Sequence, residues 1–276
     1  MQSYLAPLWL PGGHLQTIWG ARVSRPNLGP RPLYQRERWT TPDGDFIDVD
    51  LCPAADAQAP WLVLFHGLEG SSDSAYARAF AEVAAARGWS YAVPHFRGCS
   101  GELNLAPRAY HSGDFAEIDW ILRRFRSMRT SPIYVMGVSL GGNALLKWLG
   151  EQREAAREVV TRAAAVSAPV DLAAAGVALA RGFNRVYTRN FLSTLKDKTL
   201  AKMKRYPALC DAKRMRAART LREFDDLLTA PLHGFKGVDD YYARASSKPF
   251  LKYIATPTLM LNARNDPFLP ARFLPA

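Results

Sequence analysis

The sequence contains 276 residues, of which 48% are hydrophobic and 22% are charged. These fractions are typical of globular proteins and exclude a chain that is disordered over most of its length. No segment has the roughly 18 uncharged apolar residues of a membrane-spanning helix, and residues 1–11 lack the basic start and long apolar run of a signal peptide. Three widely spaced cysteines, Cys52, Cys99 and Cys210, predict neither a disulfide framework nor a zinc site. We therefore expect a protein of a reducing compartment, the cytoplasm.

The positive charge is unevenly distributed along the chain. The net charge is +11, and residues 181–220 hold twelve lysines and arginines against two acids, Asp197 and Asp211. Such a basic block can contact phosphates, anionic lipid or an acidic partner. It has few aromatic residues and no nucleic-acid motif, so we do not expect nucleic acid as a partner. A solvated helical face is the simplest interpretation of the block.

Short apolar runs alternate with helical patterns through most of the chain. Residues 1–33 are rich in proline and glycine and are expected to be irregular. Segments 37–41 and 46–51 flank Pro42-Asp43-Gly44-Asp45, which predicts an antiparallel hairpin. The apolar runs predict buried strands at 61–65, 90–93, 133–136, 163–167 and 258–262, with helices at 74–87, 114–128 and 143–149. Residues 171–250 indicate several helices without a clear strand. The pattern predicts an α/β fold with a mostly parallel, doubly wound sheet.

One pentapeptide carries the strongest chemical signal. Gly137-Val138-Ser139-Leu140-Gly141 has the pattern G-x-S-x-G, follows a predicted buried strand and opens a predicted helix. This setting is typical of a nucleophile elbow, a sharp turn that exposes a serine hydroxyl at the positive end of a helix. Because the backbone at such a serine is strained, bulky residues two positions before and after it would collide. The alternative is a glycine-rich turn with an incidental serine.

An ester hydrolase also needs N–H donors for the oxyanion that forms during the reaction. The residue after the nucleophile supplies one of them, here Leu140, and the loop after an earlier strand supplies the second. His66-Gly67-Leu68-Glu69-Gly70 occupies that loop, and we predict the N–H of Leu68 as the second donor. His66, at a strand end before glycine, is expected to hold this loop rather than to act as a general base.

The sequence contains a candidate for the acid of the triad but none for the base in the expected position. Asp266 follows the strand predicted at 258–262 and fits the chain order Ser, Asp, His of these hydrolases; an ordinary Asp-Pro turn is the alternative. A histidine should follow Asp266, but all five histidines precede it: His14, His66, His95, His111 and His233. The sequence therefore contains a candidate nucleophile and a candidate acid without a recognisable base.

Several stretches together resemble the YheT-like branch of the α/β-hydrolases, also called the AB hydrolase 4 family. The matching stretches lie at residues 13–19, 64–71, 96–101, 136–143 and 262–268, and the resemblance covers essentially the whole chain. The stretch with His14-Leu15-Gln16-Thr17 is the most specific for the family. Members resemble carboxylesterases and acylglycerol lipases that cleave acyl esters with a Ser-Asp-His triad. The resemblance therefore implies an α/β-hydrolase fold, with Ser139 as the nucleophile and Asp266 as the acid.

Two further expectations follow from this resemblance. The family carries its histidine in a Gly-Gly-His type stretch beyond the acid, and the 276 residues do not contain that stretch. The chain is thus expected to be C-terminally incomplete or degenerate, with impaired turnover. The family also places a lid after its sixth strand, which implies a helical lid at 171–245 inserted into a core of residues 1–170 and 246–276. The basic block would then lie in the lid and guide an anionic or membrane-surface substrate toward Ser139.

Three functions remain open on the sequence. The first is a serine hydrolase whose partner is a small-molecule acyl ester, and which contacts a membrane surface transiently through its basic lid. The second is a degenerate, non-catalytic hydrolase fold. The third is a basic binding module that uses the lid as its surface. We expect no cofactor and no metal, because the sequence has no dinucleotide-binding glycine motif, no phosphate-binding loop and no cluster with metal-ligand spacing.

Overall fold

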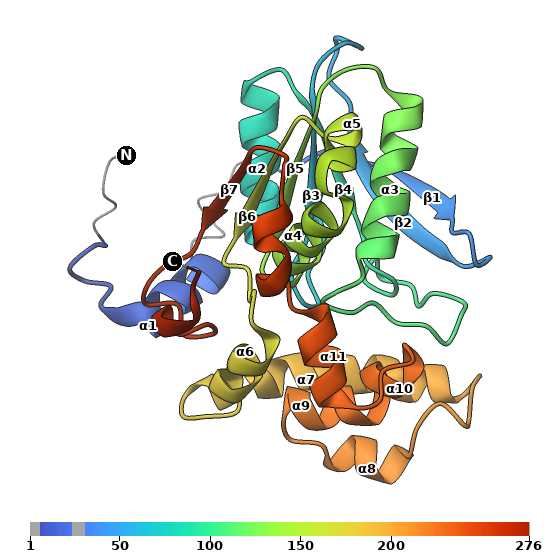
Figure 1. Cartoon of the computed structure of the whole chain (residues 1–276), viewed down its shortest axis with the longest axis vertical. Helices are drawn as coiled ribbons and strands as arrows, with labels where there is room; N and C mark the ends of the chain where they lie inside the picture. Colours follow the sequence, from blue (N-terminus) through green and yellow to red (C-terminus); the bar gives the residue numbers. More distant parts are fainter. Residues whose placement is uncertain (1–5, 24–30, 276) are drawn as a thin grey trace.

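The computed structural model describes residues 6–23 and 31–275 and places seven strands in one sheet (Figure 1). Across the sheet the strands follow the order β1-β2-β4-β3-β5-β6-β7. Their bounds are β1 Gln35–Thr40, β2 Phe46–Cys52, β3 Trp61–Phe65, β4 Ser90–Pro94, β5 Ile133–Val138, β6 Arg162–Val166 and β7 Thr258–Leu261. Each strand predicted from the sequence forms close to its expected position.

The direction of the strands also agrees with the sequence. The hairpin β1–β2 is antiparallel and forms one edge of the sheet, and β2 pairs antiparallel with β4. The other neighbouring pairs, from β4 through β3, β5 and β6 to β7, are parallel. Strand β7 therefore belongs to the same sheet as β5, as predicted. Because β5, β6 and β7 are parallel, their carboxyl ends lie side by side at the same end of the sheet.

Alternating side chains of β3 show why the sheet is covered on both faces. Leu62 and Leu64 pack with α2 (Ala75–Ala86), whereas Val63 and Phe65 pack in a larger cluster with α3 (Phe115–Met128) and α4 (Leu140–Gln152). Successive residues of a strand point to opposite faces, so a strand that is apolar throughout needs helices on both sides. Helix α4 begins at Leu140, three residues earlier than expected, and continues through η3 (Arg153–Ala155) and α5 (Ala156–Val159).

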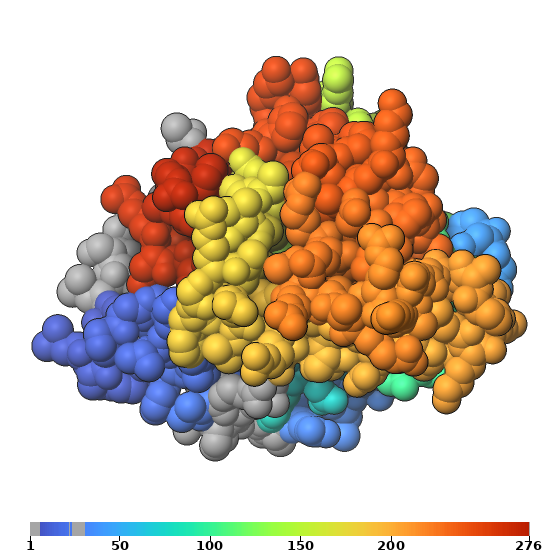
Figure 2. All heavy atoms as spheres, turned by 90° about the horizontal axis from the view of Figure 1, so that it is seen from below, coloured from blue at the N-terminus to red at the C-terminus, as the bar shows by residue number. Residues whose placement is uncertain are grey.

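The segment after β6 is helical throughout its regular elements, as the sequence predicts. These are α6 Leu172–Leu179, α7 Asn184–Met203, α8 Ala212–Ala217, α9 Leu221–Phe224, η4 Asp225–Thr229, α10 Ala230–Leu232 and α11 Val238–Ala245. The helices lie beneath the carboxyl ends of the strands (Figure 1) and form most of the surface seen from below (Figure 2). The chain then returns through η5 (Lys248–Tyr253) to β7 and ends with η6 (Ala271–Phe273). Within the described residues, no helix combines the length and the apolarity needed to cross a membrane.

The prediction that residues 1–33 are irregular is wrong for part of that segment. Helix α1 (Gly12–Ile18) and the π-helical turn η1 (Trp19–Val23) form within it. Pro11, Gly12 and Gly13 lie at the start of α1, where proline and glycine interrupt a helix least. A Cβ on Gly13 would overlap the carbonyl oxygen of Asn265, so α1 packs directly on the loop after β7. Residues 1–5 and 24–30 of the segment lie outside the described residues.

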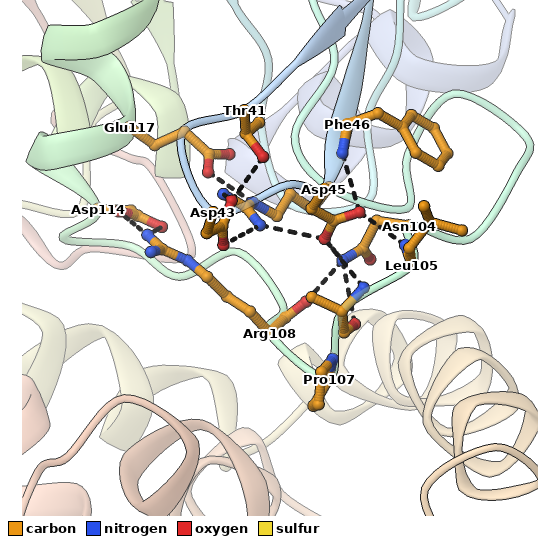
Figure 3. A network of polar contacts seen from close by, with 12 residues as sticks. Thr41, Asp43, Asp45, Phe46, Asn104, Leu105, Pro107, Arg108, Asp114 and Glu117 are labelled. Atoms are coloured by element: carbon orange, nitrogen blue, oxygen red, sulfur yellow. Dashed lines mark hydrogen bonds and ion pairs between the residues drawn. The ribbon is translucent and has the colours of Figure 1, made fainter.

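A buried cluster of charges joins the hairpin to the loop after β4 (Figure 3). The Arg97 guanidinium donates to Asp43 at 2.8 and 3.0 Å, to Asp45 at 3.1 Å and to Glu117 of α3 at 2.6 Å. Asp45 also accepts hydrogen bonds from the Asn104 side chain and from the N–H groups of residues 46, 105 and 106. The cluster fixes the loop of residues 95–114, which lies above the helices that follow β6 and contacts the site described next.

Candidate active site

Ser139 occupies the sharp turn between β5 and α4. Its backbone angles are φ 53° and ψ −120°, a region that residues other than glycine rarely adopt. The Ser139 N–H donates to the carbonyl of Val166 at 2.8 Å, and the Ser139 carbonyl accepts from Asn143 N–H at 3.0 Å. These bonds hold the strained turn between the end of β6 and the first turn of α4. The half-buried Ser139 is therefore presented at the N-terminus of a 13-residue helix.

The two glycines of the pentapeptide are required by close backbone contacts. A Cβ on Gly137 would lie 2.5 Å from the carbonyl oxygen of Gly141 and 2.6 Å from the Cα of Gly142. A Cβ on Gly141 would overlap the backbone of Phe65 and His66 at the end of β3. No side chain fits at such distances, so both glycines have the steric role that the sequence predicts for a nucleophile elbow.

The loop after β3 lies directly beside Ser139. A Cβ on Gly67 would lie 3.2 Å from the Cβ of Ser139, which places Leu68 at the next position along the loop. Within the described residues, the N–H groups of Leu68 and Leu140 donate to no other protein atom. Leu140 is the first residue of α4, where N–H groups point away from the helix. The two predicted oxyanion donors are thus unpaired and lie on the two segments that meet at Ser139.

Buried side chains hold this oxyanion loop, residues 66–70, in place. Phe96 N–H donates to His66 Nε2 at 3.0 Å, so Nδ1 carries the proton and donates to the carbonyl of Gly67 at 2.8 Å. Tyr76 accepts from Gly67 N–H, and Tyr110 accepts from Glu69 N–H, each at 2.9 Å. Because both ring nitrogens of His66 are occupied, its expected role in holding the loop agrees with its contacts.

Burial lowers the pKa of His66 from 6.5 to about 3, because the protonated ring would be deprived of water. Below pH 6.5 the unfolded chain therefore binds a proton at this residue that the folded chain does not bind. The contribution of neutral His66 to the free energy of unfolding is therefore complete above pH 6.5, and it decreases as the pH falls toward 3. We expect the wild type to lose about 1.5 kcal/mol more unfolding free energy than His66→Gln between pH 6.5 and 5. Urea denaturation at the two pH values measures this difference, and equal losses would show that the folded state accepts the proton.

Asp266 lies in the loop after β7, two strands away from Ser139. Burial raises the pKa of its carboxyl above the usual value, and hydrogen bonds from Phe268 N–H, Leu269 N–H and the Ser167 side chain oppose this increase. The Phe268 N–H donates to Oδ1 at 2.8 Å. Ser167, the residue after β6, has a positive φ of 50° and lies between the turns that carry Ser139 and Asp266. The structure thus brings the candidate acid to the same edge of the sheet as Ser139.

The other histidines have partners away from the Ser139 hydroxyl. His95 contacts Asp50 at 2.9 Å and the Cys99 carbonyl at 3.2 Å, while His14 lies 3.4 Å from the Tyr187 hydroxyl. His111 and His233 pack ring against ring with centroids 4.3 Å apart. Across residues 6–23 and 31–275, no histidine forms a hydrogen bond with Ser139.

The interpretation of the basic block as a solvated face is incomplete. Most of its cations are exposed, but Lys198 and Lys202 of α7 point toward the core. Lys198 Nζ forms an ion pair with Glu69 Oε2 at 2.8 Å. Lys202 Nζ donates to the carbonyls of Ala106, Pro107 and Arg108 at 3.0, 3.3 and 2.7 Å. The sequence alone does not predict these contacts; the signal for them is the spacing of four residues on one helix.

Comparison with known proteins defines the class to which this site belongs. Residues 60–275 match a family model described as "alpha/beta hydrolase fold". The chain therefore belongs to the α/β-hydrolase family.

Individual relatives agree with this assignment and confirm the resemblance to the YheT-like branch. The chain is 42% identical over 267 residues to the Escherichia coli (strain K12) protein named "Putative esterase YheT", covering 95% of this chain and 77% of that protein. It is 28% identical to the Homo sapiens protein named "Phospholipase ABHD3", covering 99% and 68% of the two chains. It is 31% identical to the Saccharomyces cerevisiae protein named "Monoacylglycerol lipase", of which it spans about half the length: 86% of this chain and 53% of that one.

Proposed function

We propose that the protein is a serine hydrolase of acyl esters, of the carboxylesterase or acylglycerol lipase type. The observation that carries the proposal is the strained turn at Ser139, with two unpaired N–H groups on the segments that meet there. The names of its relatives, which include an esterase, a phospholipase and a monoacylglycerol lipase, support an ester as the substrate.

The reaction proposed for this site proceeds through an acyl-enzyme. Ser139 Oγ attacks the ester carbonyl carbon, its proton passes to a base, and the carbonyl oxygen becomes an oxyanion. The N–H groups of Leu68 and Leu140 stabilise that charge, and the alcohol leaves with a proton from the protonated base. Water then attacks the acyl-enzyme by the same steps and releases the acid. Asp266 is proposed to orient and stabilise the base.

We further propose that these 276 residues alone turn over esters slowly. A histidine serves as the base in such triads, and loss of one triad member leaves only residual activity. His66 and His95 have both ring nitrogens occupied, which leaves neither free for this task.

Added imidazole can substitute for a missing base. We expect imidazole to increase hydrolysis of p-nitrophenyl acetate by the wild-type chain well above its effect on the Ser139→Ala variant, which corrects for direct catalysis by imidazole. Full activity without imidazole that is lost in Ser139→Ala would contradict this expectation and place the base among the five histidines.

We also propose that the exposed basic side of the lid contacts an anionic membrane surface transiently. Arg181, Arg185 and Arg189 are exposed, and the apolar side chains of Phe183 and Val186 between them are 50% and 56% exposed. Cations attract anionic lipid headgroups, while exposed apolar groups enter the interface.

Replacement of the three arginines by glutamine is expected to weaken binding to phosphatidylserine-containing vesicles about fivefold for each charge removed. Cosedimentation measures the binding, and Arg162→Gln, which removes an exposed arginine at the start of β6, serves as the control. Equal binding of both variants, or equal binding to neutral phosphatidylcholine vesicles, would contradict the proposal.

A further inference from the structure

Glu69 is the residue of the oxyanion loop with the most demanding conformation. It follows Leu68 directly and has a positive φ of 55°, which costs a residue with a side chain roughly 1 kcal/mol. Such a conformation persists only where the surroundings determine it. Because Leu68 and Glu69 share a peptide unit, whatever fixes Glu69 also limits the orientation of Leu68 and its neighbouring N–H groups.

Tyr110 fixes Glu69 from the loop after β4. The Tyr110 hydroxyl accepts from the Glu69 N–H at 2.9 Å and donates to Glu69 Oε1 at 2.7 Å. The Glu69 side chain is 9% exposed, so its carboxylate depends on these partners rather than on water. A nearly buried carboxylate also needs a cation.

Lys198 of the lid helix α7 supplies that cation. Its Nζ lies 2.8 Å from Oε2 and 3.0 Å from Oε1 of Glu69, and 3.6 Å from the Sγ of Cys99. Burial raises the pKa of the Cys99 thiol to about 12, so the thiol stays neutral and Glu69 is the charge that Lys198 compensates. One turn further along α7, Lys202 binds three carbonyls of the loop that carries Tyr110. Helix α7 thus contacts both Glu69 itself and the loop whose Tyr110 holds Glu69.

We propose that Lys198 is a positioning residue that couples the position of α7 to the geometry of the oxyanion hole. With α7 in place, the Lys198–Glu69 ion pair holds Glu69 in its left-handed conformation and orients the Leu68 N–H toward Ser139. When α7 moves away, the carboxylate loses its cation, and the loop relaxes. This inference rests on the proposed function, because it assigns a role within the same site.

The test combines reactivity with local protection from hydrogen exchange. A fluorophosphonate probe labels a reactive serine through a transition state whose oxygen needs the same N–H donors. Lys198→Met is expected to lower the maximal rate constant of labelling about tenfold or more. The probe concentration that gives half of the maximal rate should stay within about twofold of the wild-type value. Amide exchange in a peptide covering residues 66–72 should accelerate, because Glu69 loses the ion pair that helps to keep its N–H on the Tyr110 hydroxyl.

Matched variants separate this role from a general effect on the lid. Lys204→Met removes an exposed cation at the end of the same helix and should leave labelling and exchange unchanged, while Lys198→Arg should retain labelling within about threefold. In the double variant Lys198→Met, Glu69→Gln no uncompensated carboxylate remains, so it should be no slower than Lys198→Met alone.

Labelling and exchange in Lys198→Met equal to those of the wild type would overturn the inference. An equal loss in Lys204→Met, or additive losses in the double variant, would overturn it as well. If the wild type is not labelled at Ser139 even with imidazole as the added base, the proposed function fails. The exchange measurement then still decides whether Lys198 orders the loop.

Discussion

Replacement of Ser139 by alanine is expected to reduce labelling by a fluorophosphonate probe to the level of the unreacted background, with imidazole present as the base. The reason is that the adduct forms at the serine oxygen, and no other hydroxyl in the described residues lies at the start of α4 next to the unpaired N–H groups of Leu68 and Leu140. Residual hydrolysis of p-nitrophenyl esters should be lost together with the labelling.

The folded structure should survive this substitution. Alanine and serine experience similar strain at a φ of 53°, so the urea midpoint of Ser139→Ala should stay close to that of the wild type. Ser127→Ala, which removes an exposed hydroxyl on α3, provides the control and should label at the wild-type rate. Equal labelling of Ser139→Ala and the wild type would remove Ser139 from the reaction.

Replacement of Arg97 by leucine is expected to lower the free energy of unfolding by about 3–5 kcal/mol, the largest effect on stability that we predict. The Arg97 side chain is 3% exposed, and its partners Asp45 and Glu117 are 0% and 2% exposed. Without the guanidinium, these buried carboxylates would lose the cation that bonds to both of them (Figure 3). Burial and the nearby Asp114 already raise the pKa of Glu117 to about 7, so Glu117 would take up a proton more readily still.

Urea denaturation of Arg97→Leu tests this prediction, with Arg123→Leu as the control. Arg123 forms an ion pair with Asp119 on the exposed side of α3, and the two side chains are 47% and 25% exposed. Loss of such a surface pair should cost less than about 1 kcal/mol. Arg97→Lys keeps the charge but not the planar fork, so its stability should lie between those of the wild type and Arg97→Leu. Similar losses in Arg97→Leu and Arg123→Leu would contradict the structural role of the cluster.

The elements that depend on residues close together in the sequence could be predicted from it. Continuous apolar runs predict the strands, because a strand buried on both faces must be apolar at every position. The pentapeptide around Ser139 predicts the turn, since its glycines are demanded by contacts within a few residues and with the adjoining strand end. The position of Asp266 at the carboxyl end of a strand could be predicted because it follows the apolar run at 258–262, which forms β7 parallel to β6.

The contacts that hold the oxyanion loop could not be read from the sequence. Glu69 meets Tyr110 and Lys198 across separations of 41 and 129 residues, and no local pattern specifies such pairs. For the same reason the basic block is predicted from the sequence to be a solvated face, although Lys198 and Lys202 point inward. Helix α1 is not predicted by the composition, because the proline and glycines at its start are typical of a loop. Its packing on the loop after β7 stabilises it.

The most direct test of the central claim is to map the fluorophosphonate adduct on the wild-type chain by peptide mass spectrometry. The proposed site predicts one adduct, on the peptide containing Ser139, with its mass located on that residue by fragmentation. An adduct on a different residue, or ester hydrolysis that proceeds while Ser139 stays unmodified by a saturating amount of probe, would contradict the claim that this serine is the nucleophile.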